Sequence, residues 1–349
     1  MRIIYYCPEA ECPKGGIKVI YAHCRLLNRM GVASYLLHER KGGGCRWISG
    51  GAPAITAEAL HPADHLIIPE VNAAEVAGKL APLGLKYSIF VQNGHYLRER
   101  HGKLRDEDID RAYLGAELVL SISDSTSALI ALHYPQVAQR IVRMVCSVDP
   151  ALFRAAPEKS ELITYMPRKN AEHAAAVVYA LGKRLPPSWR VQAIERLPEA
   201  QVAQLLGRSR IFLSFSDLEG LGLPPIEAAL CGNYVLGYHG GGGLEYWQPP
   251  NFETVEVGQV VEFVDKVLAR VAAIGAQPST AALEPGIARL QQQYSEDGEN
   301  TALRQLLARL QPATMDQARG FSGAEVRAAR LQKRAKFRAW PALGRRNPR

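Results

Sequence analysis

The sequence lacks several features that would assign it to common protein classes. No apolar run approaches the roughly 18 residues that span a bilayer, and no Cys-x-x-Cys pair or Cys/His spacing suits zinc. The first twelve residues lack the long apolar segment of a secretory signal and predict a first strand. Six scattered cysteines in 349 residues predict reduced thiols and a cytoplasmic protein.

The charge is unevenly distributed along the chain. The whole chain has a net charge of +8, and residues 319–349 alone have a net charge of +9. The other 318 residues therefore have a net charge of −1. The tail, with Phe337 and Trp340 among its basic residues, is either a solvated extension or a peripheral attachment to an anionic membrane face. Nucleic acid is disfavoured as a partner because the rest of the chain provides no basic face.

Apolar strand candidates alternate with helical periodicity, which predicts an α/β protein with two largely parallel sheets. Strands are expected at residues 2–6, 33–38, 65–69, 87–92, 118–123 and 141–145, and then at 162–166, 189–194, 211–216 and 234–238. Helices are expected at residues 17–31, 105–116, 174–185, 199–209, 224–232 and 260–274. The predicted units are an N-terminal domain at 1–155, a C-terminal domain at 156–312 and a basic tail at 313–349.

Glycines follow the first strand candidate in the turn Pro13-Lys14-Gly15-Gly16. Glycine there leaves the amides of the next helix free to bind an anion or a sugar oxygen, although a tight turn needs glycine anyway. The turn is not the Gly-x-Gly-x-x-Gly of dinucleotide-dependent oxidoreductases, which argues against that class.

Two carboxylates flank a second glycine-rich turn, SFSDLEGLGLPPIEAALCG. The strand at 211–216 delivers Ser216 and Glu219 to its carboxyl end, and Glu227 follows in a helix that begins on prolines. A single glutamate there often only complements the helix dipole. Two glutamates around one strand-to-helix turn indicate a functional site.

The stretch EGLGLPPIEAALCG resembles the glutamate, seven residues, glutamate motif of retaining GT-B glycosyltransferases of the family 4 (group 1) type. Other stretches are similar to that family in the same order: GGIKVIYAHCRLLNRMG, ISDSTSALIA, VCSVDPALF and HGGGGLEYW. Cys146 and Ser147 depart from the family's usual Asn-Gly. The resemblance covers roughly residues 1–312 and implies two Rossmann-like doubly wound domains facing a cleft, the GT-B fold.

The resemblance also implies roles for individual residues. Glu227 would bind the ribose hydroxyls of a nucleoside diphosphate sugar, and Glu219 would lie beside the transferred hexose. The other candidate donor-binding residues are Gly220, Leu221, Gly222, Leu223, Gly15, Gly16 and Ser216.

The family stabilises the leaving diphosphate with an Arg and a Lys about one helical turn apart. Arg168 matches the first, but His173 occupies the later position, so Arg168 and the adjacent Lys169 are the candidates here. His95 is the closest match to the family's histidine near the transferred sugar, with Gln92 and Asn93 as competing occupants.

The implied activity is retaining, metal-independent transfer to a hydroxyl of a glycan or lipid-linked acceptor in surface polysaccharide synthesis, with no cofactor. The acidic run 106–110 contains Asp-x-Asp pairs, but an acidic helix start explains it without a metal. Two alternatives stay open. One is a catalytically silent GT-B protein that binds a sugar nucleotide or glycan, and the other is a sugar-nucleotide epimerase.

Overall fold

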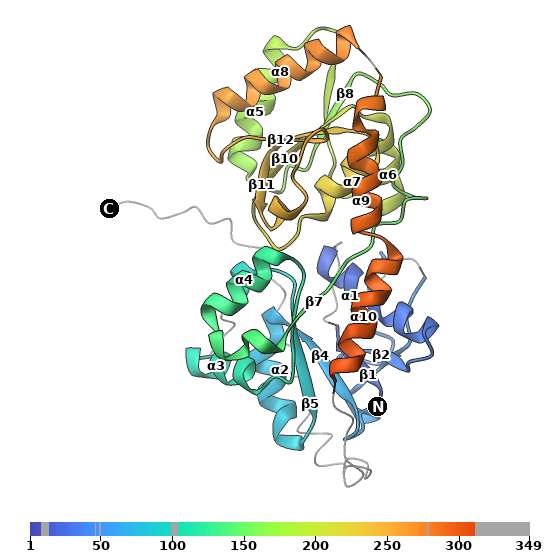
Figure 1. Ribbon diagram of the computed structural model, residues 1–349, viewed down its shortest axis with the longest axis vertical. Helices are drawn as coiled ribbons and strands as arrows, with labels where there is room; N and C mark the ends of the chain where they lie inside the picture. Colours follow the sequence, from blue (N-terminus) through green and yellow to red (C-terminus); the bar gives the residue numbers. More distant parts are fainter. Residues whose placement is uncertain (8–13, 46, 49, 99–103, 278, 311–349) are drawn as a thin grey trace, which may run out of the picture.

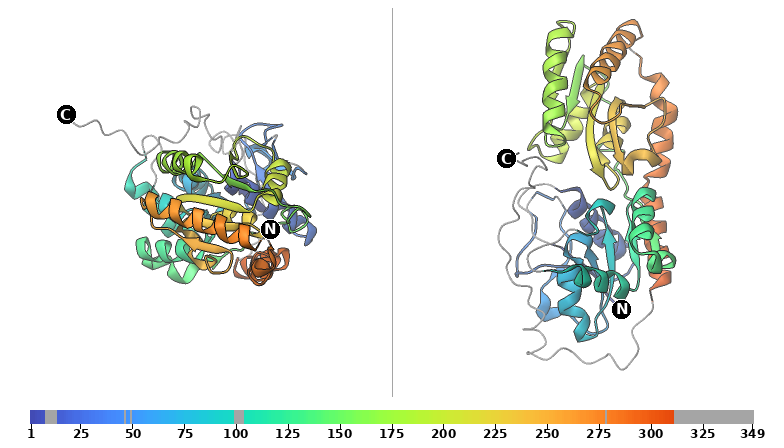
Figure 2. Two further views of the ribbon diagram at one scale, coloured as in Figure 1. Left: turned by 90° about the horizontal axis from the view of Figure 1, so that it is seen from above. Right: turned by 90° about the vertical axis from the view of Figure 1, so that its left-hand side faces the viewer.

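The computed structural model describes residues 1–7, 14–45, 47–48, 50–98, 104–277 and 279–310 (Figure 1). The basic tail, Pro13 and Cys12 lie outside the described residues. Two parallel sheets lie one above the other along the long axis of the molecule, each with helices on both faces (Figures 1 and 2).

The first sheet has seven strands in the order β3-β2-β1-β4-β5-β6-β7. They are β1 (Ile3–Tyr6), β2 (Ser34–Leu37), β3 (Ala54–Ile55), β4 (His65–Pro69), β5 (Lys86–Val91), β6 (Val119–Ser121) and β7 (Ile141–Arg143). Its helices are α1 (Gly15–Arg29), α2 (Ala73–Leu80), α3 (Asp106–Gly115) and α4 (Asp124–His133). Strand β1 is apolar throughout because Ile3 and Tyr5 enter one core and Ile4 and Tyr6 the other.

The second sheet has five strands in the order β12-β11-β10-β8-β9. They are β8 (Leu162–Tyr165), β9 (Arg190–Ala193), β10 (Ile211–Glu219), β11 (Tyr234–Gly241) and β12 (Phe252–Thr254). The helices that follow β8 are α5 (Ala171–Arg184), α6 (Glu199–Arg208), α7 (Leu223–Leu230), α8 (Val260–Ala276), α9 (Glu284–Gln293) and α10 (Glu296–Arg309). Every strand pair in both sheets is parallel, so the carboxyl ends of each sheet share one edge.

Helix α10 returns from the second sheet and packs beside α1 and β7 of the first, whereas α9 stays beside α7 (Figure 1). Its Glu299 is buried, accepts a hydrogen bond from the amide of Ser147 at 2.9 Å and lies 3.3 Å from Nε2 of His23. Arg309 donates to the carbonyl of Ile141 at 2.7 Å. The end of the described chain therefore joins the two domains a second time.

Within the described residues, none of the helices combines the length and the apolar character needed to cross a membrane.

We expect acid to destabilise the first domain through His65. This buried side chain shares a hydrogen bond with Ser88 at 2.8 Å, and burial lowers the pKa of His65 to about 4. Because the folded-state pKa lies below the unfolded value, the stabilisation is complete above about pH 6.5 and is lost as the pH falls through 4. The loss should reach roughly 3 kcal/mol, measurable by urea denaturation across this range.

The variant His65→Gln should show a weaker dependence on pH, and the exposed His133→Gln on α4 is the matched control. Equal pH dependence in wild type and His65→Gln would contradict the assignment.

Candidate functional site

The carboxyl edges of the two sheets face each other and touch. The side-chain amide of Asn93, just after β5, donates to the carbonyl of Leu218 in β10 at 3.0 Å. From α4, Thr126 donates to the carbonyl of Gly220 at 3.4 Å. The candidate residues that follow β5 and β10 therefore lie at the interface between the domains, where open parallel sheets bind ligands.

Gly220 has no room for a side chain. A Cβ atom built on Gly220 would lie 1.9 Å from the carbonyl oxygen of Gln92 and 2.9 Å from the Cα of Asn93. The carboxylate of Glu70, after β4, accepts from the amides of Gln92 and Asn93 at 3.2 and 3.1 Å and fixes that backbone. Glycine at 220 thus lets the backbones of the two domains meet.

The turn after β11 approaches the same place. A Cβ atom on Gly242 would lie 2.2 Å from the carbonyl oxygen of Gly220, which accounts for glycine here as well. Tyr246 donates its hydroxyl to the carbonyl of Gly222 at 2.8 Å. The turn 240–246 therefore supports the glycine-rich stretch that follows Glu219.

Glu219 is paired with Lys169. The register of β10 against β11 shifts between Ser216 and Glu219, so the pairing of the two strands is irregular at the end of β10. Glu219 there forms an ion pair with Lys169 from the turn between β8 and α5. Arg168 is exposed in the same turn, and Ser216 is buried in β10.

Glu227 lies on α7 with its side chain only 10% exposed, and its Oε1 is 3.4 Å from Nζ of Lys18. Burial raises the pKa of Glu227, whereas Lys18 lowers it. Lys18 was not among the candidates from the sequence. A signal existed, because a lysine near the N-terminus of a helix opposes the helix dipole and needs a partner.

The three side chains that compete for one place after β5 have different partners. Gln92 donates to the carbonyl of Gly16 at 2.8 Å, and Asn93 is engaged with Leu218. His95 is exposed in the 3-10 turn Gly94–Tyr96, and a Cβ atom on Gly241 would lie 3.7 Å from its Nε2. Of the three, His95 is the one that faces the turn after β11 from an exposed position.

Helix N-termini converge on the interface. A Cβ atom on Gly15, the first residue of α1, would lie 4.0 Å from Cδ1 of Leu223, the first residue of α7. Helix α5 begins two residues after Lys169. The positive ends of α1 and α7 favour a bound anion between the domains, although Pro224 and Pro225 provide no amide hydrogen in the first turn of α7.

Glu245 joins the domains on another side of the site. Its carboxylate accepts from Arg143 at 2.6 Å, from the hydroxyl of Tyr294 at 2.8 Å and from the amide of Asp124 at 2.8 Å. Arg143 and Asp124 belong to the first domain and Tyr294 precedes α10. Glu245, from the stretch HGGGGLEYW, thus connects the two domains, and its partners Arg143 and Tyr294 were not predicted from the sequence.

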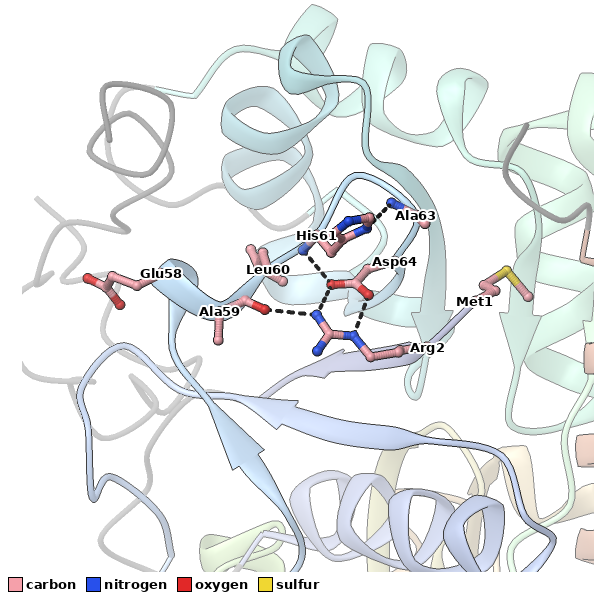
Figure 3. A pocket seen from close by; sticks show the side chains of 8 residues that line it. All are labelled: Met1, Arg2, Glu58, Ala59, Leu60, His61, Ala63 and Asp64. Atoms are coloured by element: carbon pink, nitrogen blue, oxygen red, sulfur yellow. Dashed lines mark hydrogen bonds and ion pairs between the residues drawn. The ribbon is translucent and has the colours of Figure 1, made fainter. Parts of the chain in front are cut away.

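Two other polar regions lie apart from this interface. Asp110, in the acidic start of α3, is paired with Arg98 at 2.7 Å, and the described residues contain no cluster of three or more His, Cys, Asp or Glu side chains suited to a metal. Figure 3 shows a pocket beside the amino ends of β1 and β4, where Arg2 donates to both oxygens of Asp64 at 2.7 Å. Its charges already satisfy each other, at the edge of the sheet opposite the candidate site.

Comparison with known proteins rests on structure alone, since no family model and no curated protein matches the sequence. Sucrose-phosphate synthase from Thermosynechococcus elongatus is similar at 15% identity and a TM-score of 0.65, over 88% of this chain and 98% of that one. HepE of Anabaena in complex with UDP-glucose is similar at 13% identity and a TM-score of 0.67, over 89% of this chain and all of that one.

The apo form of WaaB, a lipopolysaccharide outer core galactosyltransferase, is similar at 14% identity and a TM-score of 0.62, over 89% of this chain and 100% of that one. This chain has the GT-B fold. The fold predicted from the strand and helix pattern and from the motif resemblance is confirmed.

The backbone contact at Gly220 predicts a specific loss of stability. Gly220→Ala should lower the free energy of unfolding by about 1–3 kcal/mol, because its methyl group meets backbone atoms that cannot rotate away. Urea denaturation measures the change. Gly182→Ala on α5 is the control: nothing lies within 4 Å of its Cβ position, and the change should stabilise the helix slightly. A Gly220→Ala protein as stable as wild type would contradict the contact.

Proposed function

We propose that the chain is a retaining, metal-independent glycosyltransferase that moves a sugar from a nucleoside diphosphate sugar to an acceptor hydroxyl. The observation that carries the proposal is the pair of glutamate–lysine contacts at the domain interface, Glu219 with Lys169 and Glu227 with Lys18, beside the N-terminus of α7. Similar structures have been solved with UDP-glucose, and with UDP and glucose. UDP-sugars are therefore the first donors to test.

In the proposed site, each residue has a role that suits its chemistry. The carboxylate of Glu227 accepts hydrogen bonds from the two ribose hydroxyls, and Glu219 accepts from hydroxyls of the hexose. Lys169, Arg168 and the backbone amides of 220–223, with Gly15 and Gly16 opposite, stabilise the diphosphate as it gains charge. His95 lies on the acceptor side, next to the transferred sugar.

The bond from the anomeric carbon to the diphosphate oxygen breaks as the bond to the acceptor oxygen forms. The acceptor hydroxyl attacks from the face that the diphosphate leaves, so the anomeric configuration is retained. The hydroxyl proton passes to the departing diphosphate. No step needs a metal ion, since Lys169, Arg168 and the helix N-termini supply the positive charge.

The acceptor in this proposal is a growing surface glycan or a lipid-linked glycan. One neighbour is by its name a lipopolysaccharide galactosyltransferase, which supports an acceptor of this class. The basic residues 319–349 would hold the enzyme at the anionic inner face of a membrane, with the donor in the cytoplasm. The described cysteines, Cys7, Cys24, Cys45, Cys146 and Cys231, are buried, and the proposal places the enzyme in a reducing compartment.

A catalytically silent sugar-nucleotide-binding protein is the second candidate. It is favoured by the exposed position of Arg168 and by Cys146 and Ser147, which depart from the Asn-Gly usual in the family that the sequence resembles. Such a protein would bind the donor without consuming it. An epimerase, the third candidate, would convert the donor without any acceptor.

Turnover of UDP-sugars separates these candidates. With an acceptor glycan, or slowly with water, UDP-glucose or UDP-galactose should release UDP, and NMR of the product should show the donor's anomeric configuration. Glu219→Gln should lower kcat on the order of a hundredfold. Glu227→Gln should raise the Kd for UDP roughly tenfold to a hundredfold, the loss expected for hydrogen bonds to a charged group.

Glu75→Gln on α2, which removes an ion pair with Lys79 away from the interface, is the matched control. Binding of UDP without release from any sugar donor would support the silent protein instead. Formation of an epimeric sugar nucleotide without acceptor would support the epimerase.

The basic tail predicts binding to anionic vesicles. Ten Lys and Arg residues lie within 319–349, and each contributes about 1 kcal/mol near an anionic surface. The full chain should sediment with phosphatidylglycerol-containing vesicles and dissociate from them at high salt. It should not sediment with vesicles of pure phosphatidylcholine. A chain ending at residue 312 should not sediment. Equal binding by both chains would contradict a role for the tail.

A further inference from the structure

Lys18 is the side chain of the first domain that reaches the predicted ribose-binding glutamate. It lies near the N-terminus of α1, directly after the glycines, and its Nζ is 3.4 Å from Oε1 of Glu227. The same ammonium group forms an ion pair with Glu199 at the start of α6 and lies 5.4 Å from the ring centroid of Phe153, in the segment between β7 and β8. One cation of the first domain thus contacts two helices of the second.

Lys18 has a strong influence on the charge of Glu227 because of the surroundings of this glutamate. Glu227 is nearly buried, whereas Glu199 is 42% exposed and can keep water around its own charge. The titratable groups that face Glu227 are Lys18 from α1, Glu199 from α6 and Cys231 at the end of α7. Burial first, and then Glu199, raise the pKa of Glu227, and Lys18 lowers it.

A diol binds more tightly to the ionised form of the glutamate than to the neutral form. Two vicinal hydroxyls each donate a hydrogen bond, and only a carboxylate accepts both without competing as a donor itself. Lys18 contacts Oε1 of Glu227 and lies against Phe153, which fixes one oxygen of the carboxylate. The orientation of the Glu227 carboxylate is therefore set by a residue of the opposite domain.

We propose that Lys18 is a positioning residue for the donor: it keeps Glu227 ionised and oriented for the ribose diol, so that nucleotide binding depends on contact between the two domains. This inference rests on the proposed function, in which Glu227 binds ribose. It adds a residue of the first domain to the nucleotide site and gives the affinity a defined dependence on pH.

The test is the Kd of UDP, GDP and ADP by titration calorimetry between pH 5 and 8.5, for the full chain and its variants. Lys18→Met should move the loss of affinity on the acid side to higher pH, because burial and Glu199 then act on Glu227 unopposed. A rise of one pKa unit lowers the ionised fraction, and hence the affinity, roughly tenfold below the pKa. Lys18→Arg should restore the wild-type profile.

Glu199→Gln should move the same loss of affinity to lower pH, since it removes the neighbouring negative charge. In a Glu227→Gln background, Lys18→Met should have no further effect on the pH profile, which shows that Lys18 acts through Glu227. Lys79→Met on α2 removes a comparable lysine–glutamate pair away from the interface and is the matched control. Thermal unfolding of each variant confirms that it is folded.

The outcomes separate the two proposals. Failure of the wild-type chain to bind any of the three nucleotides would overturn the proposed function. Binding by wild type with an unchanged pH profile in Lys18→Met would overturn the inference alone. Weaker binding of Lys18→Met at every pH, without rescue by arginine, would assign Lys18 a merely structural role and also overturn it.

Discussion

The close approach of two backbones, Gly220 of the second domain against Gln92 and Asn93 of the first, is the contact on which the rest of the interface depends. It sets how far apart the carboxyl edges of the two sheets can lie, because no side chain separates them. Glu70 holds the Gln92–Asn93 backbone from one side, and the turn containing Gly242 supports Gly220 from the other. At this separation, lysines and glutamates from different elements come within reach of each other.

The charges at the interface follow from that geometry. Each candidate glutamate is paired with a lysine from another element, Glu219 with Lys169 and Glu227 with Lys18. The N-termini of α1 and α7 add positive potential without adding a mobile charge. This arrangement suits an anionic ligand with a diol at one end, the chemistry of a nucleoside diphosphate sugar. Proteins with this fold have many functions, so the proposed function rests on these pairs.

Most regular elements could be predicted from the sequence because both sheets are covered on both faces. Strand β4 coincides with the predicted 65–69, and α6 with 199–209 to within one residue. Strand β3 was missed because it has only two residues at an edge. Helix α10 was missed, and its packing on the first sheet depends on buried contacts between distant segments, such as Glu299 with Ser147.

The sequence indicated both glutamates and Lys169 as site candidates, and their roles stay predictions. Lys18 lies within the stretch GGIKVIYAHCRLLNRMG but was not singled out, and Glu70 lies in none of the stretches that resemble the family. The importance of both residues comes from partners that only the folded chain brings near. The most direct measurement is the crystal structure of the full chain with UDP-glucose. We expect ribose hydroxyls within hydrogen-bond distance of Glu227 and the diphosphate beside Lys169. Nucleotide bound away from α7, or none at saturating concentration, would contradict this expectation.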